Sequence, residues 1–71
     1  MYIIQVKKGM RLDNWTIRKG SYFSNDGAFF TGNSAKAQIF STKKAAKKLL
    51  ADIFADDVIK KFNKNLTFLP V

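Results

Sequence analysis

The hydrophobic pattern of the chain changes its period at Phe40-Ser41-Thr42. Before this point, apolar and polar residues alternate in short runs, as in residues 2–7, and this period of two is typical of strands with one buried face. After it, apolar residues recur at the helical spacing i, i+3, i+4, i+7 and i+8, at Ala46, Leu49, Leu50, Ile53 and Phe54. Strands followed by helices indicate the α+β class.

Glycines divide the first part of this region into short strands. The first alternating run ends at Gly9, and Trp15 and Ile17 begin a second one. Gly20 marks a bulge or break before residues 21–23. We expect Trp15 and its aromatic neighbours in residues 22–23 to serve the core, because the large apolar area of tryptophan favours burial.

Two turn signals follow. Asn25-Asp26-Gly27 tolerates the positive φ of a tight hairpin turn, so residues 28–31 should return antiparallel to residues 21–23. Gly32-Asn33-Ser34 predicts a second turn before a last alternating run at residues 36–39. The sequence therefore predicts a small antiparallel meander of about four strands.

The helix has a predicted start and a predicted interruption. The Ser41 hydroxyl is placed to cap the first turn, and Phe40 with Ala45 would form a hydrophobic staple. An unbroken helix would aim the carboxylate of Asp57 into the apolar stripe and set Asp52 against Asp56. A break near residues 55–56 removes both conflicts, so an Asp is expected to cap a second short helix.

The second helix would face inward with Val58, Ile59 and Phe62, while its lysines suit its negative C-terminal end. Residues 65–71 are compatible with a final edge strand, which the single proline would tolerate or end.

Composition limits the size and class of the protein. Residues 1–71 suffice for a single domain, and a hydrophobic content of 46% is enough to fill one core. There is no cysteine, so neither disulfides nor thiolate metal sites are expected. Residues 1–8 do not have the pattern of a signal peptide, and no run has the length of a membrane span. We therefore expect a cytoplasmic protein without membrane contact.

The charge favours an anionic partner. Thirteen Lys and Arg stand against five acidic residues, giving a formal net charge of +8. Such a chain is attracted to polyanions and, on nucleic acid, releases condensed counterions. The alternative is that the lysines only keep a small domain in solution.

The helix entrance is the first candidate binding site. Cations in a first helical turn oppose the positive end of the helix dipole, and an anion on the free amides there would reverse this penalty. The candidate anion-binding or nucleic-acid-binding residues at this entrance are Ser41, Thr42, Lys43, Lys44, Lys47 and Lys48. Long exposed lysines that bend into solvent are the alternative explanation.

The sheet face away from the helix is the second candidate. If Ile4 and Ile17 point inward, Lys7 and Arg18 point outward, together with other polar residues of the strands. Phe29 and Phe30 are adjacent, so a regular strand would send one of them to this outer face, where a base could stack on it. Cover by the C-terminal tail or by a second subunit is the alternative, and a homo-oligomer stays open.

Catalysis is not expected. The chain has no His and no Cys, and its Asp residues lie at turn or cap positions. Zinc-ligand spacings, a phosphate-binding glycine loop and a nucleophile elbow are missing. The sequence therefore predicts a protein that is no enzyme and needs no cofactor or metal.

Residues 37–46 carry a resemblance. The run Ala-Gln-Ile-Phe-Ser-Thr-Lys-Lys-Ala-Ala is similar to the strand-into-helix junctions of small accessory proteins from phages and prophages of Gram-positive bacteria. It covers the last predicted strand and the helix, under half of the chain. These proteins often carry Glu before the alanine, where this chain has Lys44. The resemblance implies a non-enzymatic protein of the host cytoplasm that binds host factors or nucleic acid.

Two functions of different kinds stay open. In the first, the domain binds nucleic acid, mostly through phosphate contacts and with little sequence preference. In the second, it is a phage-type protein-interaction module or inhibitor that binds an acidic host protein surface.

Overall fold

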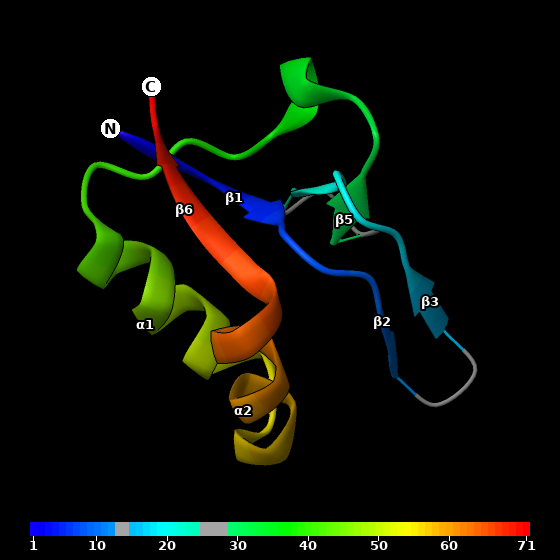
Figure 1. The fold of residues 1–71 in the computed structure, drawn as a ribbon. Coiled ribbons are helices and arrows are strands. Elements are labelled where there is room, and N and C mark those ends of the chain that lie inside the picture. Colours follow the sequence, from blue (N-terminus) through cyan, green and yellow to red (C-terminus); the bar gives the residue numbers. More distant parts are fainter. Residues whose placement is uncertain (13–14, 25–28) are drawn as a thin grey trace.

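The computed structural model describes residues 1–12, 15–24 and 29–71 and has the α+β fold expected from the sequence (Figure 1). An antiparallel sheet of four strands is combined with two helices and with a separate two-stranded ribbon. The elements in chain order are β1 (Tyr2–Val6), β2 (Met10–Leu12), β3 (Trp15–Ile17), β4 (Tyr22–Phe23), β5 (Phe30–Thr31), a 3-10 helix (Ser34–Lys36), α1 (Lys43–Ile53), α2 (Asp56–Asn65) and β6 (Leu66–Pro70).

The main sheet has the strand order β5-β4-β1-β6. The first and last strands of the chain pair along their whole length, from Tyr2 opposite Pro70 to Val6 opposite Leu66. Figure 1 shows β1 and β6 side by side, with the N and C labels at the same end of the pair. The prediction of a C-terminal edge strand is therefore confirmed.

Pro70 lies where an edge strand tolerates a missing N–H. Tyr2 exchanges backbone hydrogen bonds of 2.7 Å with Phe40, on the side of β1 away from β6. Successive residues of a strand direct their backbone groups to opposite sides, so Ile3 faces β6 and pairs with Leu69. The nitrogen of Pro70, one residue on, therefore faces the open edge, and its missing N–H costs the ladder nothing.

The predicted meander is wrong in two places. Residues 37–39 form no strand, and only Phe40 makes a bridge, with Tyr2. A 3-10 helix precedes them, because the Asn33 side chain accepts a bond from the Ala35 amide at 3.0 Å and turns the chain. Residues 15–17 do form a strand, but this strand, β3, pairs with the unpredicted β2 in the separate ribbon, with Met10 opposite Ile17.

Two other predictions about the strands are confirmed. Gly20 has a φ of +88°, in the region that glycine favours, and it interrupts the chain between β3 and β4 as expected. Strand β5 pairs antiparallel with β4, with Phe23 opposite Phe30. The predicted turn at Asn25-Asp26-Gly27 lies outside the described residues.

The helices cover one face of the main sheet and close the core (Figure 1). Ala46 and Leu50 of α1 and Phe62 of α2 are buried, and the other stripe residues of α1 pack partly buried against the same core. The most completely buried large side chains are Phe23, Phe62, Ile4, Ile17 and Val6. The apolar stripe of residues 46–54 is confirmed.

The helix break is also confirmed, but the caps differ from the prediction. Helix α1 ends at Ile53 and α2 begins at Asp56. The cap of α1 is Thr42 instead of Ser41, so Ala46 takes the N4 position and is buried, while Ala45 is exposed and the expected staple is wrong. The N-cap of α2 is Ala55, which makes no side-chain bond, and Asp56 lies one position further on, inside the first turn. There its charge still complements the helix dipole.

Candidate binding groove

The four lysines of α1 form two pairs. Successive helical residues are rotated by about 100°, so Lys43 and Lys47 share one side of the helix, while Lys44 and Lys48 share a side further from the core. All four are exposed. The sequence correctly grouped them on one helix, but they do not share a single direction.

The first pair is held beside aromatic rings. The Lys43 Nζ lies 5.5 Å from the centre of the Tyr2 ring, and the Lys47 Nζ lies 5.8 Å from the centre of the Phe68 ring. Both distances are within the range of cation–π attraction, which is worth about 0.5–1 kcal/mol at exposed sites. These contacts direct the first pair toward the β1–β6 side of α1.

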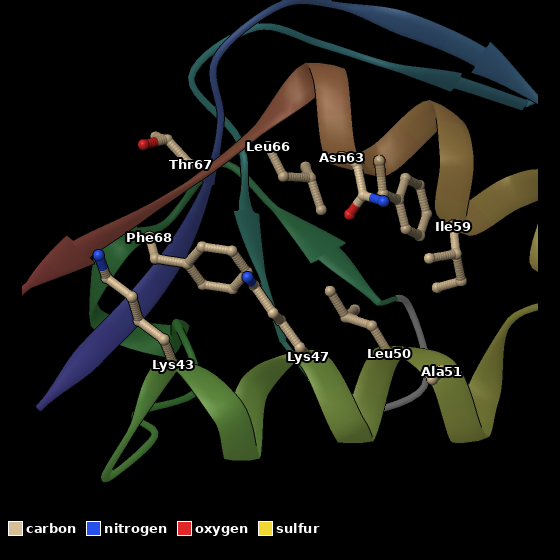
Figure 2. A pocket seen from close by; sticks show the side chains of 10 residues that line it. Lys43, Lys47, Leu50, Ala51, Ile59, Asn63, Leu66, Thr67 and Phe68 are labelled. Atoms are coloured by element: carbon tan, nitrogen blue, oxygen red, sulfur yellow. The ribbon is translucent and has the colours of Figure 1, made fainter.

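A groove of about 660 Å³ opens on this side, between α1, the second half of α2 and β6. Figure 2 shows Lys43 and Lys47 rising from α1 on either side of the Phe68 side chain, and Asn63 entering from the α2 side. The groove is lined by Lys43, Lys47, Leu50, Ala51, Ile59, Phe62, Asn63, Leu66, Thr67 and Phe68.

The helix entrance itself is partly occupied. The Thr42 hydroxyl accepts a hydrogen bond of 3.0 Å from the Ala45 amide, which takes one of the free donors of the first turn. Ser41 and Thr42 are both exposed. In the described part of the chain, no acceptor bonds the amides of Lys43 and Lys44, and these stay open to an anion or to water.

Lys7 and Arg18 do not join this groove. Lys7 follows β1, and its amide donates to the Asn65 carbonyl at 2.7 Å. Arg18 follows β3, which belongs to the two-stranded ribbon, so the prediction that both residues share one face of one sheet is wrong. Both side chains are exposed.

The predicted aromatic platform on the outer sheet face is also wrong. Phe29 and Phe30 both belong to the core-side aromatic cluster, because Phe29 has a φ of 64° and the alternation of a regular strand fails there. The Phe29 ring is 5.3 Å from that of Phe54, and the Phe30 ring is 5.9 Å from that of Phe62. Trp15 contacts both phenylalanines, as the predicted core role requires.

Sequence reasoning missed the β6 and α2 side of the groove. Phe68, Leu66 and Asn63 line it, and none of them was a candidate. The alternation of Leu66 and Phe68 in the tail was a usable signal, because residues two apart in a strand share a face. Which face of the sheet Leu66 and Phe68 share depends on the pairing of β6 with β1, and the local pattern does not predict this pairing.

Two further features are not found among the described residues. Within ranges 1–12, 15–24 and 29–71, no three His, Cys, Asp or Glu side chains gather as metal ligands. In these same ranges, no helix combines the length and hydropathy needed to cross a bilayer.

Comparison with known proteins assigns no family: no protein-family model, no curated protein and no solved structure matches the chain.

Proposed function

We propose that this chain is a small non-enzymatic binding domain for an anionic partner, and that the partner is nucleic acid held through phosphate contacts. The observation that carries the proposal is the exposure of all four lysines in the first two turns of α1, with Lys43 and Lys44 in the first turn, where the helix dipole repels cations. An arrangement that is unfavourable in the free domain becomes favourable when an anion binds. The net charge of +8 acts in the same direction.

The two pairs of lysines are better placed to contact the phosphate backbone of a nucleic acid than to contact its bases. Together they span roughly 140° of the helix circumference, which presents a broad cationic surface without a fixed direction. Lysine is a flexible point charge, which contacts phosphates without reading their sequence. With Phe29 and Phe30 in the core-side cluster, the aromatic platform first expected for stacked bases is lost. We therefore expect little base preference.

A second candidate function is supported by the apolar floor of the groove. Leu50, Phe62 and Leu66 are buried or nearly so and line this floor. A phosphate backbone has no apolar group to place there, whereas an acidic protein surface does. The alternative is therefore a phage-type interaction module or inhibitor that binds an acidic host protein.

The test is binding to mixed-sequence DNA and RNA, single-stranded and double-stranded, over a range of salt concentrations. Replacing Lys43, Lys44, Lys47 and Lys48 with Gln should weaken binding strongly. Each lost phosphate contact on a duplex should reduce the slope of log affinity against log salt by about 0.9. The matched control replaces Lys19, Lys36, Lys60 and Lys64 with Gln, which removes the same charge from other exposed positions.

The results distinguish binding at a specific site on α1 from attraction by net charge alone. Binding that is lost in the α1 variant and largely kept in the control supports the helix entrance. Equal losses would show that net charge alone attracts nucleic acid. A parent protein without salt-sensitive binding near physiological ionic strength would contradict the nucleic-acid proposal and leave the acidic protein partner.

A further inference from the structure

The outer face of the main sheet, which is the face away from α1 and α2, carries exposed apolar side chains at one end. Among the described residues, the large hydrophobic side chains that are exposed are Met1, Ile39 and Val71, at 69%, 58% and 64%. Figure 1 shows both termini at the same end of the β1–β6 pair. We propose that this end of the outer face is an interface for a second copy of the chain, packed sheet against sheet.

The β1–β6 pair supplies four apolar side chains of this surface. The Val71 amide donates to the Met1 carbonyl at 2.8 Å, and Ile3 lies opposite Leu69 in the ladder. Successive residues of a strand point to opposite faces, and Ile4 is buried in the core. Its neighbour Ile3 therefore points to the outer face, together with the residues two apart from it and the residues opposite them.

Ile39 extends this surface to the other side of β1. Phe40 exchanges two backbone bonds of 2.7 Å with Tyr2, and the side chain of Phe40 is buried. Ile39, one residue earlier, is exposed and turned away from the core, next to Ile3. We call the resulting surface the outer patch, and it consists of Met1, Ile3, Ile39, Leu69 and Val71.

The outer patch departs from the usual composition of a solvated sheet face. An antiparallel sheet with one face in water normally carries polar side chains there. Further along the same strands this is the case, because Gln5 donates to the Tyr22 hydroxyl at 3.3 Å and lies opposite Thr67. The outer patch instead brings apolar side chains of three adjacent segments together, and covering them removes this surface from water.

The distribution of charge selects a second copy as the occupant. The net charge is +8, and seven of the thirteen cations lie on α1 and α2, on the other side of the sheet. Two copies repel each other wherever their helices meet, whereas the outer patch contains no charged side chain. Packing sheet against sheet places both helical layers on the outside of the dimer. An acidic partner would be drawn to the helices instead.

A two-fold arrangement also separates the nearest lysine of this face. Lys7 continues β1, and its amide bonds the Asn65 carbonyl, so it lies on the same face as Ile3. Four residues separate Lys7 from Ile3, which corresponds to about 14 Å along a strand. With the two-fold axis near Ile3, the Lys7 side chains of the two copies lie on opposite sides of the centre, roughly 27 Å apart. This exceeds the screening length of about 10 Å at 0.1 M salt.

The small size of the outer patch predicts a weak dimer. A standard interface covers about 800 Å² of each partner. That area is roughly a sixth of the 4839 Å² surface of this molecule, and five side chains at one end of a sheet supply less. We therefore expect a dissociation constant of about 0.1 mM.

The experiment follows the full chain from about 10 µM to about 1 mM by sedimentation equilibrium and by amide chemical shifts. We expect a dimer at the upper end of this range, with concentration-dependent shifts at residues 1–5, 39 and 67–71. A chain that stays monomeric at about 1 mM overturns the proposal and leaves the outer patch to a partner of another kind. Shifts confined to α1 and α2 would overturn it as well.

A matched pair of variants tests the outer patch. Ile39→Glu and Ala45→Glu both change exposed residues and both lower the net charge from +8 to +7. Ile39→Glu buries a carboxylate in the interface and should weaken the dimer by at least about tenfold, whereas Ala45→Glu, on α1, should not. Val71→Glu should act like Ile39→Glu. Melting temperatures of the dilute proteins verify that each variant folds.

Equal dimerisation in Ile39→Glu and Ala45→Glu would overturn the proposal. It would point to pairing through the open edge of β6, because Ile39 lies on the other side of β1 from that edge.

This interface can fail or hold independently of the nucleic-acid function. Salt should strengthen the dimer, because screening reduces the repulsion between two cationic copies, but it should weaken nucleic-acid binding. The variant with Gln at positions 43, 44, 47 and 48 should lose DNA binding and dimerise at least as tightly as the parent. Ile39→Glu should lose the dimer and largely keep DNA binding. A dimer that dissociates as salt is raised would overturn the apolar interface.

Discussion

The hydroxyl group of Thr42 caps the start of α1. Thr42 is extended, with φ −140° and ψ 159°, and its side chain bonds the Ala45 amide three residues ahead. Ser41 has the same chemistry, and the local sequence fits either residue as a cap. Phe40 settles the choice: its backbone is tied to Tyr2 by two bonds of 2.7 Å and its side chain is buried, so the helix starts only after residues 41–42 have turned the chain.

Thr42→Ala should lower the free energy of unfolding by about 1 kcal/mol, the usual cost of losing an N-cap bond. Ser41→Ala is the control and should change it by a few tenths at most, because Ser41 is exposed and bonds no helix amide in the described structure. Urea unfolding of both variants checks this. A larger loss in Ser41→Ala would restore Ser41 as the cap.

Gln38 carries the clearest polar cost in the described residues. Its Oε1 is buried without a hydrogen-bond partner there, while its backbone amide donates to the Phe23 carbonyl at 3.0 Å. Gln38→Met keeps the length of the side chain and removes the unpaired acceptor, so the free energy of unfolding should rise by about 1 kcal/mol. Thermal unfolding measures the change, with Gln5→Met as control, because Gln5 already bonds the Tyr22 hydroxyl at 3.3 Å. A destabilised Gln38→Met would mean that the acceptor is satisfied in solution.

At the scale of elements, the helices, the pairing of β4 with β5 and the C-terminal strand were predictable from local rules, and the strand order of the sheet was not. The conflict that Asp57 would create in a continuous stripe locates the break, because it involves residues at most seven apart. The order β5-β4-β1-β6 instead joins the two ends of the chain, and no local pattern indicates that β6 pairs with β1. The groove depends on that pairing, which is why its lysines were found and its floor was not.

The buried stripe of α1 gives a graded prediction. Leu50→Ala should cost about 2–5 kcal/mol, because Leu50 is 4% exposed and a cavity would remain. Ile53→Ala should cost less, since Ile53 is half-buried at the last position of the helix. Lys48→Ala, on the exposed side, serves as the control and should leave the free energy of unfolding nearly unchanged. Chemical denaturation ranks the three, and equal losses for Leu50 and Ile53 would contradict the packing described for the stripe.

At the scale of the whole molecule, the charge is crowded into a small volume. The radius of gyration is 11.0 Å and the net charge is +8. In so small a molecule, neighbouring cations are separated by distances comparable to the screening length, which is about 10 Å at 0.1 M salt. Their repulsion favours unfolding, because an expanded chain separates them. The net charge follows from composition alone, whereas the placement of four cations on α1 and three on α2 needed the helix boundaries.

Raising the NaCl concentration from about 0.1 M to about 1 M shortens the screening length to about 3 Å and should stabilise the parent protein. If the relieved repulsion amounts to about 1 kcal/mol, the melting temperature should rise by about 4–8 °C, the scale for a domain of this size. The variant with Gln at positions 19, 36, 60 and 64 carries +4 and should respond less, because fewer cations remain to be screened. An equal rise in both proteins would assign the effect to general salting-out, and a flat parent curve would show that the lysines are far enough apart in the folded chain to be tolerated without a partner.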